Sequence, residues 1–268
     1  MKILGILNIT TDSFSDGGRY LDPAAALLHA DRLLAEGADI LDIGAASSHP
    51  DAAPVPPEVE IARLEAVVEP LHNTGASLSI DTFSTPVQRW ALQQGVDYLN
   101  DIHGFADPAL YPDLAASPTR LIVMHAVQEQ GLATRIDVPP GQIMDRITRF
   151  FDARLNALAA AGIAAERMIL DPGMGFFLGT NPETSLAVLG HLPELADRYG
   201  LPILVSVSRK SFLKALAGPE TSADMSAAVE MFAVRQGADM IRTHAPAPLI
   251  EALKVLEELQ ENEAPPAP

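Results

Sequence analysis

Groups that can ionise or form hydrogen bonds recur along the chain at the ends of short apolar runs. They are Asn8, Asp42, Asp81, Asn100, His125, Asp171, Lys210, Arg242 and His244. A single aspartate in such a place is usually a turn former or the N-cap of the next helix. Turn chemistry does not explain why eight successive runs all end in this way, so we interpret the set as one functional site.

Three of these groups are aspartates, and they narrow the choice of ligand. Asp42, Asp81 and Asp171 could not all stay ionised and unpaired in a partly buried cleft, so they need donors from a ligand or a metal ion. The sequence has no H-x-x-x-H spacing, and the oxygen ligands on offer suit Mg²⁺ that is carried by a substrate. A nitrogen-rich heterocycle fits the three carboxylates better, because its several N–H groups can donate hydrogen bonds to them.

Basic residues gather in or just after the last two runs, as Arg209, Lys210, Arg242 and His244. The formal net charge is −17, so an anionic substrate must be drawn in by a local cluster of bases. The last two strands of a parallel β/α barrel commonly bind phosphate. The acids and bases together predict a two-ended ligand, with a heterocycle at one end and phosphate at the other.

The elements that must position these groups follow a regular alternation. Apolar, β-branched runs occupy residues 3–9, 39–45, 77–82, 97–102, 120–126, 168–174, 202–208 and 240–245. Ala- and Leu-rich helical stretches separate them, and the first of these begins with an N-cap and proline at Asp22-Pro23 and ends at Gly37. Eight such units within about 250 residues are typical of a closed (β/α)8 TIM barrel, in which the carboxyl ends of all strands meet at one mouth.

We therefore expect a single α/β domain, a (β/α)8 barrel over residues 1–260, followed by a disordered Pro-rich tail over residues 261–268. A doubly wound open sheet shares the alternation. It is disfavoured because the first run is not followed by G-x-G-x-x-G, and no P-loop motif occurs.

Composition excludes several classes of partner. The acidic charge argues against nucleic acid, and the first apolar run is too short to be a signal sequence or to cross a membrane. The chain has no cysteine, which excludes disulfides and a cysteine nucleophile and suits a reducing compartment. We expect a cytoplasmic enzyme that acts on small polar substrates.

Several separated motifs then carry a family resemblance. They read ILNITTDSFSDGG, DIGAASSHPDA, IDTF, NDIHGF, VMHA, LDPGMGF, VSRKSF and RTH, in this order between residues 3 and 250. On these motifs the chain resembles the dihydropteroate synthases. Such enzymes join 6-hydroxymethyl-7,8-dihydropterin diphosphate to 4-aminobenzoate, releasing diphosphate and giving 7,8-dihydropteroate for folate synthesis. The resemblance implies a pterin-binding barrel that uses Mg²⁺ and forms a homodimer.

The resemblance also implies roles for individual residues. Asp81, Asn100 and Asp171 would bind the edge of the pterin, and Lys210 would donate to its carbonyl and ring nitrogen. Asn8 would help to hold Mg²⁺ with the diphosphate.

The remaining roles concern the leaving group and the reacting carbon. Arg242 and His244 would grip the diphosphate, with Asp42 in the same region. Asp12, or alternatively Asp16, could stabilise positive charge on the pterin methylene. The catalytic set is therefore Asn8, Asp12, Lys210, Arg242 and His244. The first loop, residues 10–22, is polar and long, which suits a lid.

The chain departs from the usual family pattern in two loops. Where members typically read D-I-G-G-E-S-T-R-P-G, residues 42–51 read DIGAASSHPD, and where they read G-F-G-K, residues 175–178 read GFFL. Both changes border the expected 4-aminobenzoate pocket, which we assign to Ser48, His49, Pro50, Phe176, Phe177 and Ser208. The combination resembles the sulfonamide-insensitive branch of the family. We hypothesise that the two phenylalanines clash with the bulkier drug and spare the planar substrate.

Two other functions remain open at this point. One is a pterin-binding barrel that transfers a methyl group, although such a protein has no use for R-x-H and S-R-K as anion grips. The other is a non-catalytic pterin binder, which the loss of the usual arginine at His49 suggests.

Overall fold

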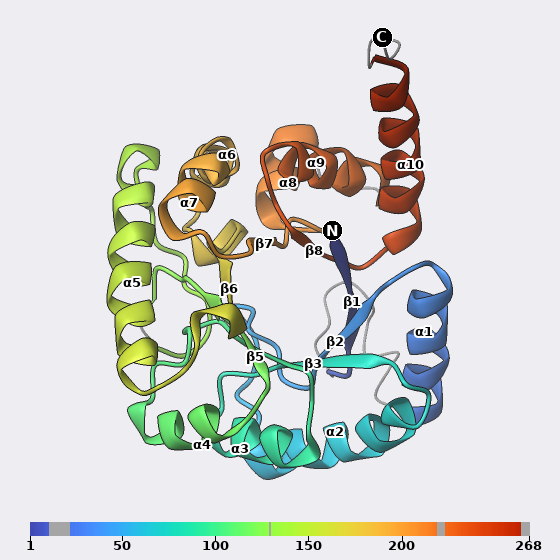
Figure 1. Cartoon of the computed structure of the whole chain (residues 1–268), viewed down its shortest axis with the longest axis vertical. Coiled ribbons are helices and arrows are strands. Elements are labelled where there is room, and N and C mark those ends of the chain that lie inside the picture. Colours follow the sequence, from blue (N-terminus) through green and yellow to red (C-terminus); the bar gives the residue numbers. More distant parts are fainter. Residues whose placement is uncertain (11–21, 129, 219–222, 264–268) are drawn as a thin grey trace, which may run out of the picture.

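The computed structural model describes residues 1–10, 22–128, 130–218 and 223–263 (Figure 1). Eight strands lie in one parallel sheet in the order β6-β5-β4-β3-β2-β1-β8-β7. Their bounds are β1 Lys2–Asn8, β2 Ile40–Gly44, β3 Ser77–Asp81, β4 Tyr98–Asp101, β5 Arg120–Met124, β6 Met168–Asp171, β7 Leu204–Val205 and β8 Met240–Thr243. A parallel bridge between Leu170 and Ile203 joins the two end strands, so the sheet closes into the predicted (β/α)8 barrel.

Helices alternate with the strands and surround the ring (Figure 1). They are α1 Pro23–Ala35, α2 Pro57–His72, α3 Thr85–Gln94, α4 Tyr111–Ala116, α5 Pro140–Ala160, α6 Pro182–Gly190, α7 Leu192–Tyr199, α8 Ser211–Ala217, α9 Ala223–Arg235 and α10 Pro246–Glu263, with short 3-10 turns η1 Pro108–Leu110, η2 Ala165–Arg167 and η3 Gly175–Phe177. None of the helices in the described ranges is long and apolar enough to cross a membrane.

Local signals in the sequence explain where the helices begin. Asp22 caps α1 by accepting a hydrogen bond from the Ala24 N–H at 3.2 Å, and Pro23 follows at the first helical position. Gly37 turns the chain out of α1 with φ +97, where a Cβ atom would lie 2.2 Å from the Ile250 side chain. At the other end of the chain, α10 runs to Glu263, so the expected domain boundary at residue 260 falls inside a helix. Residues 264–268 of the predicted tail lie outside the described ranges.

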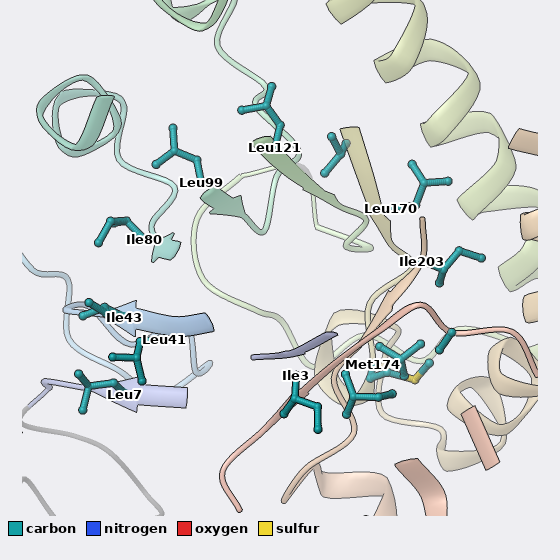
Figure 2. Packing of buried hydrophobic residues seen from close by; sticks show 14 of the residues in the cluster. Ile3, Leu7, Leu41, Ile43, Ile80, Leu99, Leu121, Leu170, Met174 and Ile203 are labelled. Atoms are coloured by element: carbon teal, nitrogen blue, oxygen red, sulfur yellow. The ribbon is translucent and has the colours of Figure 1, made fainter. Parts of the chain in front are cut away.

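Side chains alternate between the two faces of each strand and build two separate apolar layers. The outward set packs against the helices and includes Ile3, Leu7, Leu41, Ile43, Ile80, Leu99, Leu121, Leu170 and Ile203, which radiate from the ring in Figure 2. The inward set fills the barrel from seven strands and consists of Leu4, Ile40, Tyr98, Ile122, Ile169, Leu204 and Met240. We call this inward set the apolar plug.

Several functional groups lie two residues after a member of the apolar plug, so they face the same side of their strand. Asp42 lies two residues after Ile40, and Arg242 lies two residues after Met240. A period of two keeps these side chains inside the barrel and carries them toward its carboxyl end. The fold therefore places a polar layer on an apolar floor, at the mouth where β/α barrels carry their active sites.

Candidate active site

Arg242 connects the interior ends of three strands. Its Nε donates to Asp42 Oδ2 at 2.5 Å, and its Nη2 donates to Asp81 Oδ2 at 2.7 Å. The side chain of Asp42 is fully buried and that of Arg242 is 12% exposed, whereas Asp81 keeps 21%. The ion pairs therefore reach from the buried interior to the open mouth.

The register of the strands brings four site positions into one row. Asn8 pairs with Gly44, Gly44 with Asp81, and Asp81 with Asn100, across β1 to β4. A Cβ atom at Gly44 would lie 3.4 Å from Asn8 Oδ1 and 3.9 Å from Asp81 Oδ2. Because this position has no side chain, the asparagine amide and the aspartate carboxylate can approach each other over it.

Two buried acceptors, one in this row and one on β2 below it, are not used by the described part of the chain. Asn100 Nδ2 donates to Asp42 Oδ2 at 3.5 Å, but Asn100 Oδ1 and Asp42 Oδ1 have no hydrogen-bond partner among the described residues. Buried polar atoms are almost always satisfied in native proteins. These two oxygens can therefore accept from N–H or O–H donors that reach the interior.

Asp171 is presented by a tight turn after β6. Its Oδ1 accepts from the Gly173 N–H at 2.8 Å, and Gly173 has φ +79. A Cβ atom there would lie 2.4 Å from the carbonyl oxygen of His125, so only glycine fits. The ring Nδ1 of His125 lies 3.1 Å from the Pro172 carbonyl oxygen. Burial lowers the pKa of His125 to about 4, so the neutral ring donates to that carbonyl and supports the turn.

Burial and neighbouring charges bring the pKa values of several side chains at the mouth close to neutral pH. Burial raises the pKa of Asp81 to about 7 against the opposing charge of Arg242, and it raises the pKa of Asp171 to about 6. Burial and the charge of Arg242 lower the pKa of Lys210 to about 8. Burial alone would also lower the pKa of Arg242, but the carboxylates of Asp42 and Asp81 outweigh it and raise that pKa. Shifted groups of this kind cluster at functional sites.

The basic residues lie on the strand ends beside this row. The Ser208 hydroxyl lies 3.0 Å from His244 Nδ1 and accepts from the His244 backbone N–H at 3.2 Å. Burial lowers the pKa of His244 well below its usual value, as do the nearby charges of Arg209, Arg242 and Lys210. The imidazole is therefore neutral at pH 7 until an anion offsets those charges.

This arrangement differs from the expected separation of acids and bases. Arg242 does not stand in a purely basic cluster, because its two ion pairs are with carboxylates on β2 and β3. Lys210 also lies between the groups, with Nζ 4.9 Å from the centroid of the Phe177 ring. In the free protein the acidic and basic groups of the site therefore lie among one another, because the carboxylates are the nearest opposite charges for these cations.

The residues expected to border the second substrate meet in two places. His49 contacts the ring of Phe176 edge-on, with centroids 5.6 Å apart and planes at 85°. Phe176 and Phe177 belong to an apolar cluster at the mouth that also contains Phe83, Ile102, Met124, Ala126 and Ala133. Phe177 is 7% exposed. Ser48 and Pro50 are half-buried in the loop with His49, whereas Ser208 joins His244 instead.

Some predicted residues cannot be placed, and others were missed. Asp12 and Asp16, with most of the expected lid, lie outside the described residues.

The sequence did not lead us to Asp101, which lies on the outward face of β4. Its carboxylate accepts from the His103 and Phe105 N–H groups and from Gln88 Nε2 at 2.8–2.9 Å, and so anchors the loop after β4. Its place beside Asn100, at the opposite parity, is the signal that could have found it.

Comparisons with known proteins agree with this geometry. Residues 4–244 match the family described as pterin binding enzyme. The chain is 55% identical over 262 residues to dihydropteroate synthase type-2 of Escherichia coli, covering 97% of this chain and 96% of that protein. It is similar in structure to Xanthomonas albilineans dihydropteroate synthase with 4-aminobenzoic acid, with a TM-score of 0.86, 35% identity and coverage of 98% and 94%. Burkholderia cenocepacia dihydropteroate synthase complexed with 7,8-dihydropteroate gives a TM-score of 0.85, 35% identity and coverage of 97% and 92%.

Proposed function

The chain belongs to the family of pterin-binding enzymes, and from this premise we infer that it is a transferase with dihydropteroate synthase activity. It joins 6-hydroxymethyl-7,8-dihydropterin diphosphate to 4-aminobenzoate and releases diphosphate and 7,8-dihydropteroate. The observation that carries this function is the set of buried carboxylates around Arg242 and Lys210 at the barrel mouth. Such a set can hold a heterocycle rich in N–H groups while keeping cations near its anionic end.

We propose that the pterin lies against Asp81, Asn100 and Asp171. The free Asn100 Oδ1 and the carboxylates accept from the amino and ring N–H groups, which supports this placement. Lys210 donates to the pterin carbonyl and ring nitrogen. Its pKa of about 8 leaves it mostly protonated at pH 7.

Arg242, His244, Asn8 and Asp42 are proposed to serve the diphosphate. The pairing of Arg242 with two carboxylates keeps the guanidinium charged inside the barrel. When the Asp81 carboxylate turns to the pterin, one arm of that guanidinium becomes available to the leaving anion. His244 stands beside Lys210 and Arg242, and a diphosphate there would favour its protonated form.

A magnesium ion fits this donor set only as the partner of the substrate. Among the described residues no three His, Asp or Glu side chains form a metal-binding group. Asn8 Oδ1 is an amide oxygen at the mouth, and Mg²⁺ is usually bound by few protein oxygens together with substrate phosphates. We propose that Asn8 holds the ion with the diphosphate. When bound, the ion would neutralise charge on the leaving group.

The reaction itself asks for positioning and charge stabilisation. The bond from the pterin methylene carbon to oxygen breaks, and its electron pair leaves with diphosphate. The lone pair of the arylamine nitrogen forms the new C–N bond, and that nitrogen then loses a proton to solvent water. A neutral arylamine is already nucleophilic, so no strong general base is required. Asp12 is proposed to stabilise the positive charge that develops on the methylene.

We propose that 4-aminobenzoate lies near Ser48, His49 and Pro50, close to Phe176 and Phe177, with Ser208 at the basic side. The packing of His49 on Phe176 supports a continuous wall there. The apolar cluster takes up volume that a flat carboxylate substrate does not need. A drug with a tetrahedral sulfonyl group does need it, so we propose low sensitivity to sulfonamides.

The chain is further proposed to act as a cytoplasmic homodimer. The absence of cysteine from the sequence supports a reducing compartment. Light scattering of the purified protein tests the oligomeric state, and a mass of one chain at micromolar concentration would contradict the dimer.

Diphosphate release tests the main proposal. The protein is mixed with the dihydropterin diphosphate, 4-aminobenzoate and Mg²⁺, and both products are measured. We expect equal amounts of diphosphate and dihydropteroate, and loss of turnover after chelation. Pterin binding without diphosphate release would indicate a non-catalytic binder. Methyl transfer from a methylated reduced pterin would indicate the other rival.

A further inference from the structure

An ion pair joins two loops at the mouth and takes no part in the proposed chemistry. Asp51 lies in the loop that follows β2, and Arg135 lies 84 residues later in the loop that follows β5. The guanidinium donates to both carboxylate oxygens, through Nη1 at 2.7 Å and through Nη2. The Ala133 N–H donates to the Ser48 carbonyl oxygen at 3.0 Å, so the backbones of the two loops meet beside the pair.

A third loop, the one that follows β6, is fastened to the same place. The Val127 N–H donates to the Phe177 carbonyl oxygen at 2.9 Å, and the Thr180 N–H donates to the Ile136 carbonyl oxygen at 2.8 Å. Three loops that are far apart in the sequence therefore form one rim of the mouth.

The ring of Phe176 is held inside this rim between two polar side chains. The guanidinium carbon of Arg135 lies 5.7 Å from the ring centroid, within the range of a cation–π contact. His49 meets the ring edge-on from the loop after β2, and its Nδ1 lies 3.2 Å from the Asp51 backbone nitrogen, which donates to it. Burial lowers the pKa of His49, so the imidazole that touches the ring is neutral at pH 7.

We propose that the Asp51–Arg135 pair is a latch that positions Phe176 across the mouth and so sets how tightly the aromatic second substrate binds. This proposal rests on the proposed function and adds two positioning residues to it. Neither side chain needs to touch substrate or the reacting atoms. The link to the site runs through Phe176, which packs in the same apolar cluster as Phe177, the ring beneath Lys210.

The exposure of the latch separates its role from general stability. Asp51 and Arg135 each keep 50% of their side-chain surface exposed, and exposed ion pairs contribute little to folding. Loss of the pair should therefore loosen the rim and leave the barrel folded.

The molecule contains a matched control on its outer helices. Arg198 on α7 pairs with Asp152 on α5 at 2.7 Å, with side chains 51% and 44% exposed. Its guanidinium also lies over an aromatic ring, 5.6 Å from the centroid of Tyr199. Arg198→Ala therefore removes the same kinds of contact away from the mouth.

The experiment compares steady-state kinetics of the full chain with Arg135→Ala, Asp51→Ala, the double variant, Asp51→Glu and Arg198→Ala. We expect each latch deletion to raise KM for 4-aminobenzoate about fivefold while kcat stays within about twofold. The double variant should be no worse than Arg135→Ala, because both lack the ion pair and the contact of Arg135 with the Phe176 ring. Asp51→Glu keeps a carboxylate and should keep most of the native KM, and Arg198→Ala should change neither constant.

Hydrogen exchange gives a second measurement that does not need turnover. In Arg135→Ala the amide of Ala133 should lose protection about tenfold, whereas Arg198→Ala should leave it unchanged. An unchanged KM in both latch deletions, or an equal rise in Arg198→Ala, would overturn the latch. If the native chain does not release diphosphate, the proposed function fails, and protection of Ala133 still decides whether the latch holds the rim.

Discussion

At the scale of single residues, the contacts of Arg242 couple protonation to the availability of charge. Its guanidinium is held by Asp42 and by Asp81, and only the second of these carboxylates is partly exposed. Because the pKa of Asp81 is about 7, a change of its protonation state near neutrality alters one arm of the pair. The site therefore responds to pH through specific side chains whose shifts have stated causes.

We predict a bell-shaped pH profile for kcat/KM of the pterin substrate. Asp171 and Asp81 must accept hydrogen bonds, so activity should rise with pH through about 6 to about 7. Lys210 must donate, so activity should fall as pH passes about 8. Initial rates at low substrate concentration across this range check the profile. A flat profile would contradict these assignments, and in Lys210→Arg the basic limb should move beyond the range.

A second prediction concerns the two phenylalanines. Phe177→Gly should lower the inhibition constant of a sulfonamide about tenfold, with a smaller change in KM for 4-aminobenzoate, because the added space suits the larger molecule. Phe176→Gly is the comparison, since that ring is more exposed and borders the latch. No fall in the inhibition constant in either variant would refute the steric explanation.

At the scale of elements, turns decide where the strand-end groups point. The turn after β6 holds Asp171 through the Gly173 N–H, and the neutral ring of His125 supports it from the neighbouring strand end. The loop after β4 is held in the same way by Asp101 and Gln88. We therefore expect ligand affinity to depend on residues that do not themselves contact the ligand.

Gly173→Ala tests the turn. The new Cβ atom would meet a backbone oxygen at 2.4 Å in a left-handed conformation, so we expect a loss of about 2 kcal/mol in stability and at least tenfold in pterin affinity. Calorimetry and thermal unfolding measure both. Gly141→Ala is the matched control, because that glycine lies in the first turn of α5 with nothing within 4 Å of the new atom. It should be neutral or slightly stabilising. Equal affinities in the two variants would mean that the turn does not position Asp171.

Much of this arrangement could be predicted from the sequence, and the reasons are local. The alternation of strands and helices, and the period of two that puts Asp42 and Arg242 inside the barrel, can be read from the sequence. The partners of these groups could not, because the ion pair from Arg242 to Asp42 spans 200 residues. The Asp51–Arg135 pair could not be predicted either, because the two residues lie far apart in the sequence, in loops that have no periodicity.

At the scale of the whole molecule, buried carboxyl groups tie stability to pH. Glu230 on α9 is fully buried behind the barrel, and burial raises its pKa to about 7. Asp81 and Asp171 are raised in the same direction. An acid whose folded-state pKa is raised holds its proton in the folded state, so its contribution to stability is present below the unfolded value and is lost as pH rises through the folded one. These three carboxyl groups should therefore contribute less to the stability of the free protein at about pH 8 than at about pH 5.

Glu230→Gln tests this dependence away from the site. The variant removes a buried charge that forms above pH 7, so it should raise stability at about pH 8 by about 2 kcal/mol and change little at about pH 5. Denaturant unfolding at the two pH values gives the difference. Asp224→Asn, at an exposed position in the first turn of the same helix, is the control and should change stability by less than about 1 kcal/mol and equally at both pH values. A parallel shift of both variants at both values would argue against burial as the cause.

The alternation of inward and outward side chains also limits which insertions the strands can accept. A residue inserted into β2 or β8 would turn Asp42 or Arg242 outward and bring apolar neighbours into the barrel. We therefore expect the lengths of these two strands to be preserved in related proteins. The loops after β2 and β6 have no such alternation, so a change in their length leaves the strand-end side chains facing the interior. We therefore expect natural variation to alter the rim of the mouth more readily than the strand-end groups inside the barrel.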